Sequence, residues 1–171
     1  GENAGDALTS GNDNTLVGDN AGTEVTTGFN NTFIGSRSGD AISTADNNVA
    51  VGFNSLGSDT KGDRNVALGS AALATQNFTT TTDAYNVAVG YTAGFSVTTG
   101  IKNTLIGGLA GDALTEGSNN VAVGYFALTA DTLGSKSVAL GQGTLFAQNF
   151  TTATDAYNVA VGYTAGVAIT T

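Results

Sequence analysis

The sequence predicts an all-β fold, a parallel β-solenoid of about ten 17- to 21-residue coils. The first observation is a short motif, Asn-Val-Ala-Val-Gly at residues 86–90, that occurs nine times in related forms. The second is its regular spacing, in which three 17-residue steps are followed by one 21-residue step, twice over. Self-similarity at such a period is typical of solenoids, in which each unit contacts only its neighbours. The third is that each unit is too short for a useful helix, while its β-branched residues and turn dipeptides favour a strand.

The repeats have a second, longer period. Residues 83–94 return unchanged at 155–166, and the fourth unit of each 72-residue super-repeat carries a four-residue insertion. We therefore predict one domain over residues 1–171, with super-repeats at 14–85 and 86–157 and partial units at both ends. The chain starts with glycine at the first position of a unit, so we expect a segment of a longer protein or a processed chain.

Two columns of residues are predicted to hold the turns and ladders of the stack. A glycine closes each motif, as expected for a corner that needs a positive φ or the close approach of another backbone. The asparagine that opens the motif is expected to stack its amide on that of the next coil. These ladder and corner residues are Asn14, Gly18, Asn31, Gly35, Asn48, Gly52, Asn65, Gly69, Asn86, Gly90, Asn103, Gly107, Asn120, Gly124, Gly141, Asn158 and Gly162.

The alternation within the motif indicates which residues share a face. Val87 and Val89 fall on one face of the strand and Ala88 on the other. Motifs with valine in second place have alanine in third, whereas motifs with threonine there, such as Thr15, have leucine or phenylalanine, such as Leu16. We infer that both faces are covered, with the valines filling the coil and the third position lying against another chain. This interpretation favours an oligomer.

A second compensation lies beyond the corner. Some coils have a second glycine four residues after the corner glycine. These coils carry an apolar residue three residues after that second glycine, as in Gly22 with Val25. Coils with leucine there carry aspartate or glutamine instead, as in Leu56 with Asp59. We interpret these as two ways to fill one slot in the core.

Composition restricts the function. The net charge is −9 with only five Lys and Arg residues, so nucleic acid is not expected as a partner. The sequence contains no run of about 18 apolar residues, so we expect no membrane insertion. His and Cys are absent, so we expect no enzyme, no metal and no cofactor. Glycan hydrolysis by paired carboxylates is a weaker alternative, since the acidic residues are scattered at turns.

The four-residue insertions are predicted to project as loops and are the best candidates for recognition. Each combines aromatic rings that can stack on a sugar with a carboxylate that can accept its hydroxyls. The alternative is that Phe78 and Phe150 fold back onto the rod or a neighbouring chain. The candidate ligand-binding residues are Phe78, Asp83, Tyr85, Phe150, Asp155 and Tyr157.

The pattern Asn-Val-Ala-Val-Gly-Tyr-x-Ala, at residues 86–93, 120–127 and 158–165, resembles the head repeats of trimeric autotransporter adhesins. The 17-residue spacing with Thr-Thr-Gly punctuation is similar to the repeats of bacteriophage tail fibres. The resemblance covers essentially the whole chain. It implies a β-roll that associates as a homotrimer, located outside the cell, on the cell surface or on a virion.

We therefore expect a structural and adhesive fibre segment that acts as a rigid spacer, associates with itself, and presents loops to a host cell-surface glycan or protein. One alternative is a subunit of a self-assembling extracellular filament. Another is an ice-binding solenoid, because one column forms a hydroxyl ladder. That column is Thr9, Thr26, Ser43, Thr60, Thr98, Thr115, Thr132 and Thr170.

Overall fold

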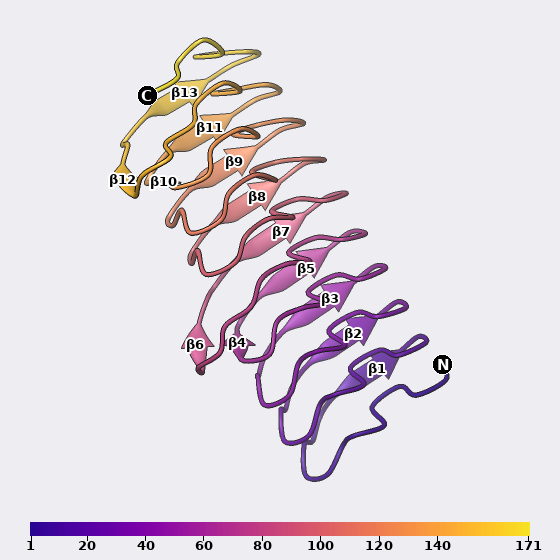
Figure 1. Cartoon of the computed structure of the whole chain (residues 1–171). Helices are drawn as coiled ribbons and strands as arrows, with labels where there is room; N and C mark the ends of the chain where they lie inside the picture. The colour runs from indigo at the N-terminus through magenta and orange to yellow at the C-terminus, as the bar shows by residue number, and fades with distance from the viewer.

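The chain folds into a rod of stacked coils, described over residues 1–171 by a computed structural model that contains strands and turns but no helix (Figure 1). Nine strands, one per coil, form a parallel sheet in the order β1-β2-β3-β5-β7-β8-β9-β11-β13. Their bounds are β1 (Thr15–Val17), β2 (Thr32–Ile34), β3 (Val49–Val51), β5 (Val66–Leu68), β7 (Val87–Val89), β8 (Thr104–Ile106), β9 (Val121–Val123), β11 (Val138–Leu140) and β13 (Val159–Val161). The predicted all-β parallel solenoid is confirmed.

Equivalent residues lie directly over one another along the whole sheet. Ala88, for example, pairs with Ala67 of the coil before and with Leu105 of the coil after. Residues 1–11 stack on the first of these coils without forming a strand, and the backbone N–H of Gly5 donates to the carbonyl of Ala21 at 3.0 Å. The rod thus has nine coils that each contain a strand, and one partial coil without a strand at its start.

The middle residue of each strand points into the coil. Ala88 and Leu105 are fully buried, whereas Val89 is half-buried and Val17 and Ile106 are 53% and 37% exposed. The prediction that the valines fill the inside and that the third motif position lies against another chain is therefore wrong. The two residues flanking the middle one face outward and stay half-buried or exposed.

The reason is a narrow interior whose volume is shared by two positions in most coils. Four leucines project inward from a left-handed turn with φ of 51 to 54°, namely Leu56, Leu73, Leu128 and Leu145. The strand residue six positions earlier is alanine in each of these coils. Gly111 takes the turn position where the strand has Leu105, and a Cβ on Gly111 would lie 2.7 Å from the Cδ2 of Leu105. In seven of the nine coils the strand residue is therefore compensated by this turn residue. In the other two, Ala88 and Ala160 stand with Gly94 and Gly166, and leucines of neighbouring coils reach the space, since a Cβ on Gly94 would lie 2.7 Å from the Cδ1 of Leu105.

Leucine in a left-handed turn carries a backbone cost of about 1 kcal/mol. Complete burial of its side chain contributes about 2 kcal/mol, so burial outweighs the strain. The other predicted compensation is confirmed, because Val25 and Leu114 are fully buried in coils that lack such a leucine. The polar residues that replace them, such as Asp59, are buried as well.

The corner glycines and the asparagine column hold successive coils together. Gly52 has a φ of 130°, and a Cβ there would lie 2.7 Å from the carbonyl carbon of Gly69 in the next coil. The side-chain Oδ1 of Asn86 accepts the backbone N–H of Asn103 at 2.9 Å, while its Nδ2 donates to the carbonyl of Gly100 at 2.8 Å. Each such amide satisfies backbone groups inside the coil and joins two coils.

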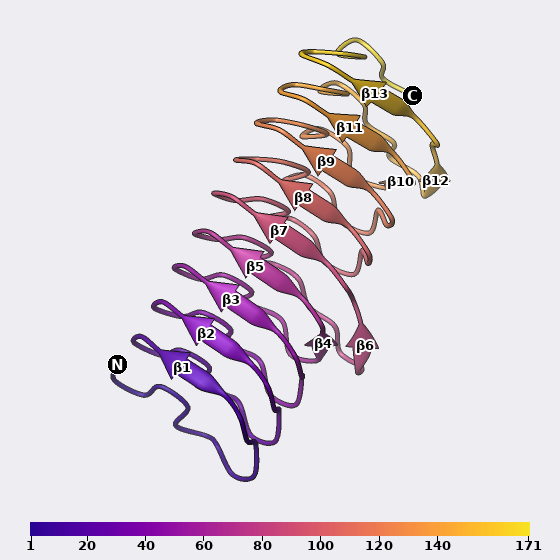
Figure 2. The ribbon, with the colours of Figure 1, turned by 180° about the vertical axis from the view of Figure 1, so that it is seen from behind.

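The four-residue insertions form two further small sheets at one edge of the rod, away from the main sheet (Figures 1 and 2). In the first, β4 (Gly62–Asp63) pairs in parallel with β6 (Thr82–Asp83). In the second, β10 (Gly134–Ser135) pairs with β12 (Thr154–Asp155). Each inserted loop is thus supported by the coil before it.

Candidate functional site

The outer face of the nine-stranded sheet is one candidate functional surface. Its two columns hold fifteen aliphatic residues and three threonines, and no charged residue. The first column is Thr15, Thr32, Val49, Val66, Val87, Thr104, Val121, Val138 and Val159, and the second is Val17, Ile34, Val51, Leu68, Val89, Ile106, Val123, Leu140 and Val161. These partly exposed side chains form one continuous apolar strip parallel to the rod axis, which we call the outer strip.

The inserted loops, the second candidate, divide their predicted residues between the core and the solvent. Phe78 is only 6% exposed and Phe150 is half-buried, so the alternative in which these rings fold back onto the rod holds for Phe78. Tyr85 and Tyr157 remain 48% and 64% exposed. Phe78 is therefore unable to offer its ring to a ligand, whereas the tyrosines keep that freedom.

Each loop carries an exposed cluster of a cation, a carboxylate and a tyrosine. Arg64 forms an ion pair with Asp83, and its guanidinium lies 5.7 Å from the ring centroid of Tyr85. The cation comes from the preceding coil. Arg64 directly follows β4 and Asp83 lies in β6, so the pairing of these two strands brings the two side chains together.

The second loop, in the next super-repeat, has the same arrangement. The Nζ of Lys136 donates to Asp155 at 2.7 Å and to the hydroxyl of Tyr157 at 3.1 Å. The pKa of Lys136 is raised chiefly by its hydrogen bond to Asp155, and the pKa of Asp155 is lowered chiefly by the same bond. Sequence reasoning missed Arg64 and Lys136. The sequence signal that could have identified them is their position. Each directly precedes the asparagine or serine that opens a 21-residue unit.

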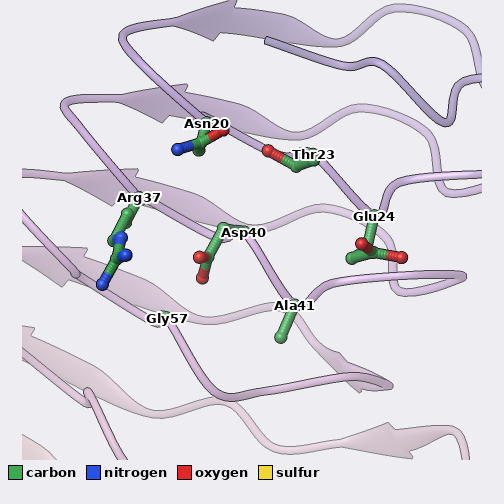
Figure 3. A pocket seen from close by; sticks show the side chains of 7 residues that line it. All are labelled: Asn20, Thr23, Glu24, Arg37, Asp40, Ala41 and Gly57. Atoms are coloured by element: carbon green, nitrogen blue, oxygen red, sulfur yellow. The ribbon is translucent and has the colours of Figure 1, made fainter. Parts of the chain in front are cut away.

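The turns that follow the strands hold shallow clefts, the third candidate. Figure 3 shows one in front of the strands, lined by Asn20, Thr23, Glu24, Arg37, Asp40, Ala41 and Gly57. It has a volume of about 340 Å³ and is mostly polar. Burial raises the pKa of Asp40, while the guanidinium of Arg37 acts in the opposite direction.

Further along the rod the equivalent clefts contain aromatic and aliphatic side chains beside polar ones. One, of about 450 Å³, lies among Tyr91, Phe95, Leu109 and Asp112. The other, of about 270 Å³, includes Phe126, Phe146 and Val167. The same turn thus presents a polar surface near the start of the chain and an aromatic one beyond its middle.

The threonine column is used within the stack. The hydroxyl of Thr98 donates to the carbonyl of Thr115 at 3.2 Å, and that of Thr115 donates to the carbonyl of Thr132 at 3.1 Å. These side chains are half-buried. Their donors are therefore engaged in joining coils, which weakens the interpretation of the column as an ice-binding surface.

The fold defines the chain as a parallel β-solenoid repeat protein that has no helix with the length and apolarity to cross a membrane. Searches with the chain matched no family model, no curated protein and no solved structure. Its function is therefore inferred from the surfaces described above.

Proposed function

We propose that this chain is a structural and adhesive segment of an extracellular fibre, on a cell surface or a virion. In this role it is a rigid spacer that associates with two further copies of itself and presents its inserted loops to a surface. The observation that carries the proposal is the uncharged aliphatic strip along the outer face of the sheet. The proposal assigns no reaction to the chain.

The stack is built for length. Strands in a sheet lie about 4.8 Å apart, so the eight steps between β1 and β13 span roughly 38 Å. Backbone hydrogen bonds run from coil to coil along this axis, and the buried amide ladder reinforces them. Because each coil contacts only its neighbours, adding coils adds reach without changing the cross-section.

A second copy is the occupant that suits the outer strip. The strip is straight, repeats every coil and carries no charge, so an identical strip placed against it meets no unpaired polar group other than threonine hydroxyls. Two columns about 10 Å wide and 38 Å long present roughly 400 Å², within the range of large functional patches on monomers. The number of three copies rests on the resemblance to trimeric adhesin heads.

The inserted loops lie at another edge of the rod, which leaves them free when the strip is covered (Figure 2). Their exposed Tyr85 and Tyr157 combine with charged neighbours, a chemistry that fits a host cell-surface glycan or protein. Two such loops on each chain, repeated over three chains, give several weak contacts that act together.

The test is the mass and shape of the protein in solution, by light scattering and small-angle X-ray scattering. We expect an elongated particle with three times the chain mass of 16.9 kDa. Val89→Lys with Val123→Lys places two charges on the strip and is expected to give folded monomers. The control is Thr27→Lys with Thr99→Lys, at exposed positions outside the strip, which keeps the trimer. A wild-type monomer, or a trimer that survives the valine changes, contradicts the proposal.

A further inference from the structure

A column of exposed aromatic rings runs along the rod beside the outer strip. The residue directly after the corner glycine is aromatic in every second coil from the third onward. These residues are Phe53, Tyr91, Tyr125 and Tyr163, with exposed fractions of 57%, 64%, 49% and 75%. We call them the aromatic track. Large rings this exposed carry apolar surface that a core would normally hide.

The coils between these rings leave room for them. Ser70, Gly108 and Gln142 occupy the intervening positions, and none is large and apolar. A Cβ on Gly108 would lie 3.3 Å from the Cδ2 of Tyr125, so that ring leans over the coil before it. The result is a row of separate aromatic platforms, of which Tyr125 covers the space over the coil before it.

The spacing of the platforms follows from the sheet. Two coils correspond to about 10 Å along the axis. An extended β-1,4-linked pyranose chain repeats every two sugars at close to this length, and alternate sugars then present the same face to one side. Sugar rings stack their apolar faces on aromatic side chains. A straight row of rings at this interval therefore suits a straight polysaccharide lying parallel to the rod.

Polar groups stand beside the track at the cleft in the middle of the rod. Tyr91 lines that cleft together with Phe95 and Asp112. One oxygen of the Asp112 carboxylate accepts a hydrogen bond from the hydroxyl of Thr129. Carboxylates are good acceptors for sugar hydroxyls, so the other oxygen can orient a chain that the rings hold by stacking.

Charge selects among polysaccharides. None of the five cations, Arg37, Lys61, Arg64, Lys102 and Lys136, belongs to the column that carries the rings. The chain as a whole carries a net charge of −9, which repels acidic glycans. Stacking, in contrast, needs no charge on the ligand.

We infer that the aromatic track binds an extended neutral polysaccharide of β-1,4-linked pyranoses, aligned with the rod axis. This deepens the proposed adhesive function by naming a class of ligand, and it rests on that function only in assuming that the track stays uncovered in the assembled fibre. The rival occupant is another copy of the chain, because the track borders the outer strip.

The test is titration with neutral hexasaccharides of β-1,4-linked glucose and of β-1,4-linked N-acetylglucosamine, followed by tyrosine fluorescence and calorimetry. The protein has no tryptophan, and three of its five tyrosines lie on the track, so stacking is read directly. We expect at least one of these hexasaccharides to bind, at least tenfold more tightly than its disaccharide because it spans more than one ring. We also expect little dependence on salt and no binding of polygalacturonate.

Variants assign the binding to the track. Tyr91→Ala with Tyr125→Ala and Tyr163→Ala is expected to weaken hexasaccharide binding at least tenfold, while the three corresponding Tyr→Phe changes keep it within about threefold, since stacking needs the ring alone. Phe29→Ala removes a ring that is 40% exposed and belongs to neither the track nor the loops, so it is the matched control and is expected to bind like the wild type. Light scattering on every variant reports the number of copies in parallel.

The outcomes separate this inference from the fibre proposal. Binding to a monomeric wild type supports the track and removes the trimer. A trimer that binds neither hexasaccharide overturns the inference, and so does a triple alanine variant that binds as well as the wild type. A triple alanine variant that dissociates into monomers shows that the rings are a contact between copies and likewise overturns it.

Discussion

Asp59 and Gln76, one coil apart, meet inside the rod, where the Oδ2 of the aspartate accepts the side-chain Nε2–H of the glutamine at 2.5 Å. The pair recurs at Asp131 and Gln148, at 2.6 Å. The other oxygen of Asp59 accepts the backbone N–H of Phe78 at 3.1 Å, at the start of the first inserted loop. A buried polar pair thus replaces apolar residues at the two places where the coil widens, and it fixes the loop to the core.

Removal of this anchor is expected to be costly. Asp59→Ala leaves the amide of Gln76 and the N–H of Phe78 without their acceptor, and each buried group so orphaned costs about 1–3 kcal/mol. We expect the free energy of unfolding to fall by about 3 kcal/mol in urea denaturation, together with faster hydrogen exchange over positions 78–85. The unchanged second anchor, at Asp131, serves as an internal control. A loss below about 0.5 kcal/mol, or equal exchange in both loops, is incompatible with the anchoring role.

The amide ladder predicts a similar sensitivity. The side chain of Asn103 accepts the N–H of Asn120 at 3.0 Å and donates to the carbonyl of Gly117 at 2.9 Å. Asn103→Ala is therefore expected to lower the free energy of unfolding by about 2 kcal/mol or more. Thr99→Ala, at an exposed position, is the control and should change it by less than about 0.5 kcal/mol. Equal effects of the two substitutions would argue against a structural ladder.

The shared interior volume is testable with a double-mutant cycle. Gly111→Leu introduces a side chain that meets the Cδ2 of Leu105 and is expected to destabilise the protein by several kcal/mol. Leu105→Ala alone leaves a cavity and costs about 3 kcal/mol. The double variant restores the alanine and leucine pair found in the coil of Leu128, while Leu114 stays where that coil has Asp131, so we expect the second substitution to recover part of the loss, with a favourable coupling of about 1 kcal/mol or more. Additive losses would show that the two positions do not share a space.

The pH dependence of stability depends in part on Asp63. Burial raises its pKa above the ordinary value of 3.8, while the backbone N–H of Asp46, which donates to its side chain at 2.9 Å, acts in the opposite direction. The folded protein then holds the proton more tightly than the unfolded chain does. This contribution to stability is therefore fully present below the ordinary pKa of 3.8 and is lost as the pH rises through the raised pKa of folded Asp63. We expect the melting temperature to fall from about pH 4 toward neutral pH.

Asp63→Ser is the variant that isolates this effect. Ser135 stands at the equivalent place in the second super-repeat and accepts the N–H of Ser118 at 3.0 Å, so serine can keep the bond without the charge. We expect the variant to show a smaller fall in melting temperature over the same pH range. An unchanged slope, or a wild-type stability that rises with pH, contradicts the assignment.

The sequence was sufficient to predict the stack, because a regular period fixes which residues lie over one another. It misled on which face of the strand is inside. Val-Ala-Val alternation shows that the two faces differ, and the larger residues were assigned to the core. The inside is instead filled by the middle residue of the strand, such as Leu105, together with residues of the left-handed turn, such as Leu73 with a φ of 51°. Leucine in that conformation has no signature in a single sequence.

The inserted loops can be found in the sequence because they interrupt the period, but the placement of their side chains required coordinates. Phe78 and Tyr85 lie in the same inserted loop, and only the burial of the first tells them apart. The partner of Asp83 is Arg64 of the preceding coil, which is placed by the pairing of β4 with β6. Contacts between inserted segments and the coil before them do not follow from the period, because the insertion interrupts it.

The solvent accessibility of the Val89 and Val123 methyl groups tests most directly whether the outer strip is an interface between copies. It can be measured by NMR relaxation with a soluble paramagnetic agent. We predict that both methyl groups are shielded at concentrations where the protein is trimeric, while the methyl group of exposed Thr99 is not. Methyl groups on the strip that relax as fast as that of Thr99 would show that the strip faces water and would contradict the fibre account.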